Sequence, residues 1–310
     1  MAVLCLVGGV AVFLFGMELL CAGLERISRP YVHLLCTHSF VRSMFLSALF
    51  TACVQSSSAV TVMIAGLAAS NVLPPERSLG LIAGANIGTC ATAFLVHAGL
   101  HIIPPVPPIA PVFLLVFLPF LVRRTCPVWL CLCGGVPALL CGMSYMQAAL
   151  VPLSDTSFFS YLCACHTPLY GLLAGAVMTA VLQSSSACIA LLQAANGMLT
   201  IGLVFPLLLG QNIGTCVTAL LASLGMNAAA RQTARLHLLF NVIGAAALFP
   251  FFLFMQLLFP SLIAQPADSS LIAWMHLFIN LSSALLFYLL RRPLSRHVIK
   301  SSSPPVQRAA

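Results

Sequence analysis

Long apolar runs, separated by short polar or proline-rich stretches, make up most of this chain. A transmembrane helix needs about 20 apolar residues, and these runs predict seven membrane-spanning helices, one of them short. The predicted spans lie at about residues 3–24, 79–99, 109–122, 128–149, 199–224, 236–259 and 271–290. The pattern therefore predicts an all-α polytopic membrane protein.

Two further apolar segments each contain the run Gln-Ser-Ser-Ser-Ala, which begins at Gln55 and at Gln183. Each unpaired polar group in hydrocarbon costs several kcal/mol. One such residue can hydrogen-bond to a neighbouring helix, but four successive helical residues point all round the axis. A break in the helix lets them line a shared polar cavity instead. We therefore predict a re-entrant helical hairpin at each motif.

The chain repeats itself internally. Three blocks recur in the same order: Gly-Gly-Val, the Gln-Ser-Ser-Ser-Ala motif, and Asn-Ile-Gly-Thr-Cys. The blocks begin at Gly8, Gln55 and Asn86 in the first half, and at Gly134, Gln183 and Asn212 in the second. The offset is 126 residues from Gly8 to Gly134 and 128 residues from Gln55 to Gln183. A repeat of this length is the size expected for half of a transporter.

Cationic residues mark the cytoplasmic side of a membrane protein, and here they place the N-terminus outside and the C-terminus in the cytoplasm. If both motif segments are re-entrant, every Lys and Arg falls inside. Each half then has three crossings and one hairpin, and an odd number of crossings inverts the second half relative to the first. The predicted organisation is a first repeat at 1–122 and a second at 123–260, each with a span, a hairpin and two spans. A final span at 261–292 precedes a disordered cytoplasmic tail at 293–310.

Composition supports a membrane protein and excludes a large soluble domain. Hydrophobic residues make up 61% of the chain and charged residues 6%, whereas soluble domains are about 25% charged. The net charge of +8 could suggest a nucleic-acid-binding protein, but the cations sit in small groups between apolar runs, as the positive-inside rule requires. We expect a lipid bilayer as partner, no nucleic acid, and a place in the plasma (cytoplasmic) membrane. A homodimer is a further option that the sequence leaves open.

The repeated polar residues form the candidate binding site. Neutral oxygens of Gln, Ser, Thr and Asn suit hard cations such as sodium, while hydroxyls, amide hydrogens and half-helix N-termini also suit an oxyanion. The predicted substrate and ion ligands are Gln55, Ser56, Ser57, Ser58, Asn86, Thr89, Gln183, Ser184, Ser185, Ser186, Asn212 and Thr215. A subset of them would hold sodium, with Thr51 and Thr179 as further candidates.

An anion in such a site needs its charge balanced by cations. Only Glu18 and Glu25 place a carboxylate in or beside a predicted span, and no basic residue is predicted at mid-depth. This set favours cation-coupled symport by alternating access, since a proton-driven mechanism would more naturally show a buried Asp, Glu or His in the site. We expect no cofactor, with sodium ions as the coupling ions.

Two His-x-x-x-Asn pairs lie outside this site. His237 and Asn241 are four residues apart, as are His276 and Asn280, so each pair shares one helix face. The plain interpretation is helix packing around a satisfied histidine, and these residues are not included in the predicted site.

With these pieces assembled, the sequence resembles the type II sodium-dependent phosphate cotransporter family over about residues 5–290. The resemblance rests on Phe15-Gly16-Met17, both Gln-Ser-Ser-Ser-Ala motifs, both Asn-Ile-Gly-Thr blocks, the stretch from Arg231 to Gly244, and His276-Leu-Phe-Ile-Asn280. It implies inverted repeats, two re-entrant hairpins and sodium-coupled uptake of inorganic phosphate. It also implies that the Gln-Ser-Ser-Ser residues help to form the phosphate and sodium sites.

The chain departs from this family at two points. Family members often have Thr-Thr after Asn-Ile-Gly, whereas Cys90 and Cys216 occupy the second position here. A thiol is a poor ligand for a hard cation, so we expect no sodium contact from these side chains. Many bacterial relatives carry a C-terminal PhoU-like helical domain, and we expect none because the sequence stops soon after its last predicted span.

Other functions remain as alternatives. The same fold could export phosphate or carry another oxyanion. An intramembrane enzyme with a serine nucleophile is disfavoured, because the sequence places no fixed base beside the serines and contains no Gly-x-Ser-x-Gly elbow. A channel is disfavoured because two inverted re-entrant segments indicate alternating access.

Overall fold

The computed structural model describes residues 2–28, 34–35, 37, 39–102, 127–154 and 167–302. Within these residues the chain is almost entirely helical. The only β-type pairing among them is an isolated antiparallel bridge between Thr200 and Pro266. Five helical stretches are long and apolar enough to cross a membrane: Pro75–Gly99, Val128–Leu150, Ile201–Leu224, Ala228–Leu258 and Ser269–Leu294. The helix content and the five apolar helices confirm the prediction of an all-α, multi-pass membrane protein.

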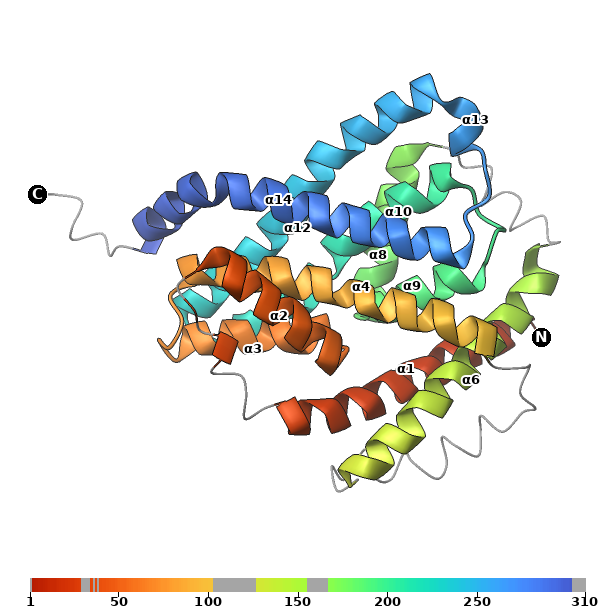
Figure 1. Ribbon diagram of the computed structural model, residues 1–310, viewed down its shortest axis with the longest axis horizontal. Helices are drawn as coiled ribbons and strands as arrows, with labels where there is room; N and C mark the ends of the chain where they lie inside the picture. Colours follow the sequence, from red (N-terminus) through yellow and green to blue (C-terminus); the bar gives the residue numbers. More distant parts are fainter. Residues whose placement is uncertain are drawn as a thin grey trace, which may run out of the picture.

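Figure 1 shows the helices in space. They are α1 (Ala2–Ser28), α2 (Phe40–Val54), α3 (Ser57–Ala69), the short 3-10 turn η2 (Pro75–Arg77), α4 (Ser78–Ile102), α6 (Val128–Ser154), α8 (Pro168–Leu182), α9 (Ser185–Ala194), α10 (Ile201–Gly214), α11 (Cys216–Leu224), α12 (Ala228–Leu258), α13 (Pro260–Ile263) and α14 (Ser269–Ser302). The five candidate spans match the predicted spans at 79–99, 128–149, 199–224, 236–259 and 271–290.

The two other predicted spans have different outcomes. The predicted span at 3–24 lies within α1, a helix of 27 residues whose Val3–Gly16 portion is apolar. The span at 109–122 lies outside the described residues. Helix α14 continues to Ser302, past the predicted end of the last span at residue 292 and through Pro293. The end of the predicted tail, 303–310, also lies outside the described residues.

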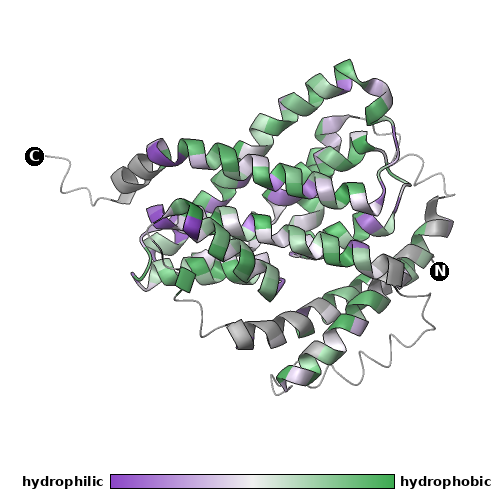
Figure 2. Ribbon diagram, viewed as in Figure 1, coloured by the Kyte–Doolittle hydropathy of each residue, from purple (hydrophilic) through white to green (hydrophobic). Residues whose placement is uncertain are grey.

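Most of the helical ribbon carries the hydrophobic colour in Figure 2. Large side chains such as Val181, Leu257 and Leu289 are more than 60% exposed. A soluble protein rarely exposes so many large apolar groups. The surface therefore fits contact with lipid acyl chains.

Glycines bring α2 and α4 into close contact. Gly80, Gly84 and Gly88 on α4 face α2 at one-turn intervals, and a Cβ atom on any of them would lie too close to the α2 backbone. The contacts follow the same order along both helices, from Phe40 opposite Gly80 to Thr51 opposite Gly88. Helices α2 and α4 therefore run parallel, joined by the small-residue pattern that lets membrane helices approach closely.

Helices α8 and α10 form the equivalent pair in the second half. Gly210 lies against Leu172, and Gly214 lies against Ala176 and Thr179. These contacts again follow the same order along both helices, so α8 and α10 are also parallel. The same packing of small residues thus recurs in both halves of the chain.

Helices α1 and α6 pack against each other in the opposite sense. Gly9 contacts Gly142, and Gly16 contacts Gly135, with each glycine at the backbone of the other helix. Because a higher residue number on α1 meets a lower one on α6, the two helices run antiparallel. Gly9 and Gly135 are equivalent residues of the internal repeat, as are Gly16 and Gly142. Exchanging the two halves therefore turns one contact into the other.

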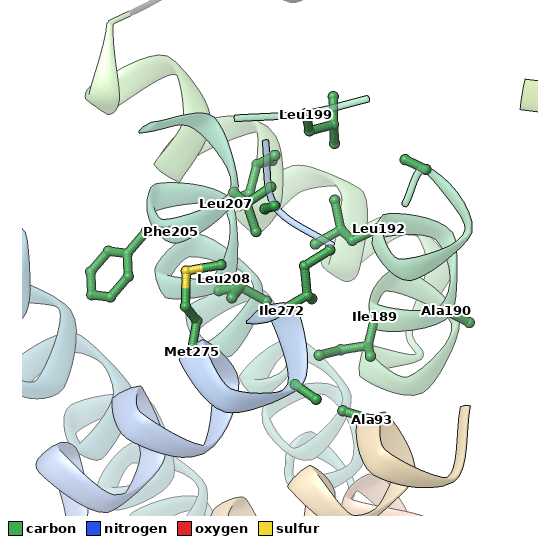
Figure 3. Close-up of a cluster of buried hydrophobic side chains, with 14 of the residues drawn as sticks. Ala93, Ile189, Ala190, Leu192, Leu199, Phe205, Leu207, Leu208, Ile272 and Met275 are labelled. Atoms are coloured by element: carbon green, nitrogen blue, oxygen red, sulfur yellow. The ribbon is translucent and has the colours of Figure 1, made fainter. Parts of the chain in front are cut away.

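The largest apolar core joins helices from both halves. Figure 3 shows Ile189 and Leu192 of α9 facing Leu207 and Leu208 of α10, with Ile272 of α14 between them. Ala93 of α4 and Phe13 of α1 belong to the same cluster. Helix α9 is thus held inside the protein by residues of the first half as well as the second.

Gln193 stabilises this core through two buried hydrogen bonds. Its side chain is fully buried on α9, and its Nε2 donates to the carbonyl oxygens of Ala93 on α4 (2.9 Å) and Ser269 on α14 (2.8 Å). One polar side chain therefore links three helices.

Replacing Gln193 with leucine should lower the melting temperature of the detergent-solubilised protein. The change removes two buried hydrogen bonds, worth about 1 kcal/mol each. Melting followed by size-exclusion chromatography measures the effect. The control is Gln265→Leu, at an exposed position, which should melt within a degree or so of the parent protein. Equal melting of all three proteins would contradict the role assigned to Gln193.

Candidate functional site

The first Gln-Ser-Ser-Ser motif interrupts the helix at Gln55 and Ser56. Gln55 has a left-handed backbone (φ 59°, ψ 20°) and ends α2, while Ser56 is extended (φ −142°, ψ 98°). The Ser56 hydroxyl accepts a hydrogen bond from the backbone N–H of Ala59 (3.2 Å). Serine is one of the preferred residues for capping the start of a helix, so the motif itself begins α3.

The second motif adopts the same geometry. Gln183 is left-handed (φ 50°, ψ 22°) and ends α8, and Ser184 is extended (φ −142°, ψ 105°). The Ser184 hydroxyl accepts from the N–H of Ala187 (3.2 Å). A left-handed glutamine is uncommon, and its appearance at both equivalent positions indicates that the motif encodes this break.

Free serine hydroxyls follow each break. Ser57 and Ser185 stand at the first positions of α3 and α9, are 7% and 5% exposed, and have hydroxyls with no hydrogen-bond partner among the described residues. The first backbone N–H groups of a helix also lack partners within it. Each break therefore offers a hydroxyl and the positive end of a helix dipole, a combination that suits an anion.

The Asn-Ile-Gly-Thr blocks lie inside α4 and at the end of α10. The hydroxyls of Thr89 and Thr215 donate to the carbonyl oxygens of Ala85 and Gln211, one turn earlier (both 2.9 Å). Asn86 likewise donates to Ile82 in its own helix (2.9 Å). These donor bonds leave the oxygens of the side chains as acceptors, which is the capacity that a cation requires.

A side-chain hydrogen bond connects each motif to the helix that carries the adjacent block. Thr92 on α4 donates to Oε1 of Gln55 (3.0 Å). Gln211 on α10 donates through Nε2 to the carbonyl oxygen of Ser185 (3.0 Å). Gln211 was missed by sequence reasoning because its equivalent in the first half is Ala85, so the repeat gave no signal for it.

Asn280 on α14 brings the two blocks together. It accepts from Nδ2 of Asn212 (3.2 Å), and its own Nδ2 lies 3.5 Å from the thiol of Cys90. Asn241 on α12 makes the matching contact with the thiol of Cys216 (3.1 Å). The two cysteines thus hold asparagine side chains. The repeated His-x-x-x-Asn spacing was the signal that could have added Asn241 and Asn280 to the predicted site.

The interpretation of a satisfied histidine is wrong. His237 is 1% exposed, and neither of its ring nitrogens has a hydrogen-bond partner in the described residues. Nδ1 of His276 is also buried without a partner. The oxygens Oδ1 of Asn241 and Oε1 of Gln211 are likewise buried without a hydrogen-bond partner. Buried polar atoms are normally hydrogen-bonded, so these unpaired atoms are candidates to bind ions or water.

The two halves differ in the contact between the motif glutamine and the equivalent threonine of the neighbouring helix. Gln55 is buried and bonded to Thr92. At the equivalent positions Gln183 is exposed, and the buried hydroxyl of Thr218 has no partner. The glutamine–threonine bond of the first motif therefore has no counterpart in the second, which Gln211 holds through the Ser185 carbonyl oxygen instead.

The predicted ligands fall into three groups by burial. Ten are buried, counting the two further sodium candidates: Thr51, Gln55, Ser57, Asn86, Thr89, Thr179, Ser185, Ser186, Asn212 and Thr215. Ser56, Ser58 and Ser184 are half-buried, and Gln183 is exposed. Each motif helix packs on a helix of the other half, because α3 contacts α11 and α9 contacts α4.

Comparison with known proteins identifies the family. The sequence model of the Na+/Pi-cotransporter family matches residues 12–130 and 138–262. This chain belongs to the Na+/Pi-cotransporter family. Both motifs and both Asn-Ile-Gly-Thr blocks lie within the matched ranges, so the resemblance that these residues indicated is confirmed. No solved structure matches the chain.

Three relatives illustrate the range of this cotransporter family. The "Uncharacterized protein YqeW" of Bacillus subtilis is 31% identical over 89% of this chain and 90% of its own length. The "Putative inorganic phosphate export protein YjbB" of Escherichia coli is 25% identical over 94% of this chain, which spans 54% of that protein. The human "Sodium-dependent phosphate transport protein 2C" is 47% identical over 23% of this chain and 13% of its own length.

Proposed function

We propose that this protein is a secondary transporter that couples sodium to the movement of inorganic phosphate by alternating access. The observation that carries the proposal is the pair of equivalent helix breaks, each followed by a buried serine whose hydroxyl is free at a helix N-terminus. Ser57 and Ser185 would donate to phosphate oxygens, together with unpaired N–H groups of α3 and α9. The names of two relatives, one for phosphate export and one for sodium-dependent phosphate transport, agree with this cargo.

Each motif unit is proposed to be a re-entrant hairpin. Helices α2 and α4 are parallel, and α4 starts soon after α3 ends. These two observations support a path in which α3 returns toward the start of α2, with Gln55 at the tip. The parallel pair α8 and α10 supports the same path for α9. Such irregular backbone is tolerated at membrane depth where it lines a protein cavity.

The halves are proposed to be inverted repeats. The reciprocal contacts of Gly9 with Gly142 and of Gly16 with Gly135 support this relation. Helices that are equivalent and antiparallel are related by an axis perpendicular to them, which lies in the membrane plane. Transporters with such repeats bind substrate near the midplane, where the two halves meet.

Charge balance favours sodium as the coupling ion. No Lys or Arg hydrogen-bonds the motif serines among the described residues, so a phosphate there needs cations beside it. Unpaired buried oxygens are present in Gln211, Asn241 and Thr51. Neutral amide and hydroxyl oxygens of this kind suit a hard monovalent cation. We propose that sodium binds among them, without assigning each ion to a residue.

Orientation and gating follow from the same features. Arg77, Arg291 and Arg292 line one pocket at one end of the helices, and the positive-inside rule assigns that end to the cytoplasm. The N-terminus would then lie outside. The difference between the bonded Gln55 and the exposed Gln183 supports a protein that is open on one side of the membrane. Exchange of these two arrangements between the halves would open the other side.

Purified protein in liposomes should accumulate labelled phosphate when an inward sodium gradient is applied. The uptake should fall to background when potassium or choline replaces sodium, because the coupling sites are proposed to take sodium. Empty liposomes provide the baseline. Uptake that is equally fast without sodium would overturn the coupling, and uptake blocked by sulfate rather than arsenate would overturn the cargo.

Phosphate export is the second candidate, and it is favoured by the printed name of the Escherichia coli relative. The same liposomes, loaded with labelled phosphate, distinguish the directions. Release that requires an outward sodium gradient indicates that one symport cycle runs both ways. Release that is independent of sodium would favour a dedicated exporter over the proposed symporter.

A further inference from the structure

A pocket of about 420 Å³ lies where α2, α4 and α14 meet. Its lining comes from the start of α2, from η2 and the start of α4, and from the late part of α14. Ser39, Phe40 and Ser43 line it from the α2 side, and Arg291 and Arg292 from α14. Figure 2 shows hydrophilic colouring gathered at this end of the molecule, where α2 and α4 begin.

The pocket is positively charged. Arg77, Arg291 and Arg292 line it, against a single carboxylate from Glu76. Arg291 is held in place, because its guanidinium stacks on the ring of Tyr288 (3.7 Å) and donates to the Tyr288 carbonyl oxygen (2.6 Å). Arg77 and Arg292 are exposed, and no hydrogen bond or ion pair to a described residue occupies them. Two guanidinium groups are therefore available for a ligand.

Backbone and hydroxyl donors converge on the same space. Helices α2 and α4 are parallel and both begin here, so their positive dipole ends face the pocket together. Ser43 contributes a hydroxyl, which shares a hydrogen bond with Thr37 (2.7 Å). Arginine guanidinium groups, hydroxyls and helix N-termini are the groups that proteins use to bind a phosphate group.

Membrane orientation alone does not account for this arrangement. The positive-inside rule requires arginines at the cytoplasmic end, but it does not require them to surround one hollow beside two helix starts. The second half supplies a comparison: Ser39 corresponds to Thr167, Ser43 to Gly171 and Arg77 to Leu203. That half therefore has the paired helix starts without the arginine that Arg77 supplies in the first half.

The pocket is separate from the motif site. Helix α2 has 15 residues and runs from Ser39 at the pocket to Gln55 at the break. At 1.5 Å per residue it separates the two places by about 22 Å. A phosphate held in the pocket cannot touch the motif serines.

We propose that this pocket binds a phosphate group at the membrane surface, either as inorganic phosphate or as the phosphate of an anionic lipid headgroup. The recognition chemistry is common to both: bidentate guanidinium contacts from Arg77 and Arg292, with the two helix starts behind them. The inference goes beyond the proposed transport function, since it concerns a second site and holds whichever ion drives transport.

The test uses the full-length, lipid-stripped protein in sodium-free detergent, so that no transport is required. In one arm, calorimetry measures binding of inorganic phosphate. In the other, native mass spectrometry counts bound phosphatidylglycerol, with zwitterionic phosphatidylcholine as reference. The pocket variant is Arg77→Gln with Arg292→Gln. The matched control is Arg231→Gln with Arg235→Gln on α12, which removes the same charge outside the pocket.

The parent protein and the α12 control should bind at least one probe, and the pocket variant should bind that probe about tenfold or more weakly, as expected for lost charged hydrogen bonds. The charge-retaining variant Arg77→Lys with Arg292→Lys should keep part of the affinity, which separates binding from a folding defect. Binding in the first arm alone assigns the pocket to free phosphate, and binding in the second alone assigns it to lipid. Equal affinity of the pocket variant and the parent protein, or no binding of either probe, would overturn the proposal.

Discussion

Replacing Ser57 or Ser185 with alanine should lower phosphate transport by at least about tenfold, the cost of one hydrogen bond to a charged ligand. Both residues are buried, their hydroxyls have no hydrogen-bond partner among the described residues, and neither caps a helix, so removal of the hydroxyls leaves the breaks intact. The loss should appear mainly as a raised KM for phosphate, because a ligand contact is removed. Initial rates of labelled phosphate uptake in liposomes, over a range of phosphate concentrations, measure the change.

The control for these variants is Ser70→Ala at the end of α3. The Ser70 hydroxyl is exposed and bonds only to carbonyl oxygens of Gly66 and Leu67 in its own helix. Transport by this variant should remain within about twofold of the parent protein. If both Ser57→Ala and Ser185→Ala keep the parental KM, the helix N-termini are not the phosphate ligands and the proposed site is wrong.

Replacing Gly210 with alanine should abolish the folded protein. The added Cβ would overlap the carbonyl oxygen of Leu172 on α8, which is backbone and cannot rotate away. Helices α8 and α10 would have to separate, and the second motif would lose the helix against which it is held. The yield of monodisperse protein in size-exclusion chromatography should fall to a few per cent of the parental yield.

Gly66→Ala is the matched control, because Gly66 lies inside α3 and a Cβ there meets nothing within 4 Å. This variant should be at least as stable as the parent protein, since alanine favours a helix by about 1 kcal/mol over glycine. The comparison separates close packing from helix propensity. Normal yield and melting of Gly210→Ala would show that the α8–α10 contact tolerates separation.

The sequence was most informative where polarity conflicts with the membrane. The helix type and five of the spans follow from apolar run length alone. The breaks at Gln55 and Gln183 could be anticipated because four adjacent polar residues cannot share one helix face. The repeat then identified Asn86 and Asn212 through their equal neighbours.

Tertiary partners were harder to anticipate, because they depend on which helices meet. Gln211 has no equivalent in the first half, and Gln193 lies outside every repeated block, so neither was singled out. Asn280 was set aside as a packing residue, yet it contacts Asn212 and Cys90 from different halves. The difference between Gln55 and Gln183 is invisible in identical motifs, since it reflects the conformation that the whole protein adopts.

The reciprocal glycine contacts between α1 and α6 have a consequence for the origin of this chain. A surface in which residue i meets j, while the equivalent of j meets the equivalent of i, is self-complementary. Such an isologous surface is what joins two identical subunits around a two-fold axis. A polypeptide of half this length could therefore have paired with its own copy through the Gly9 and Gly16 face. Duplication and fusion of its gene would have preserved that contact and freed the two copies to diverge, as Arg77 and its counterpart Leu203 have done.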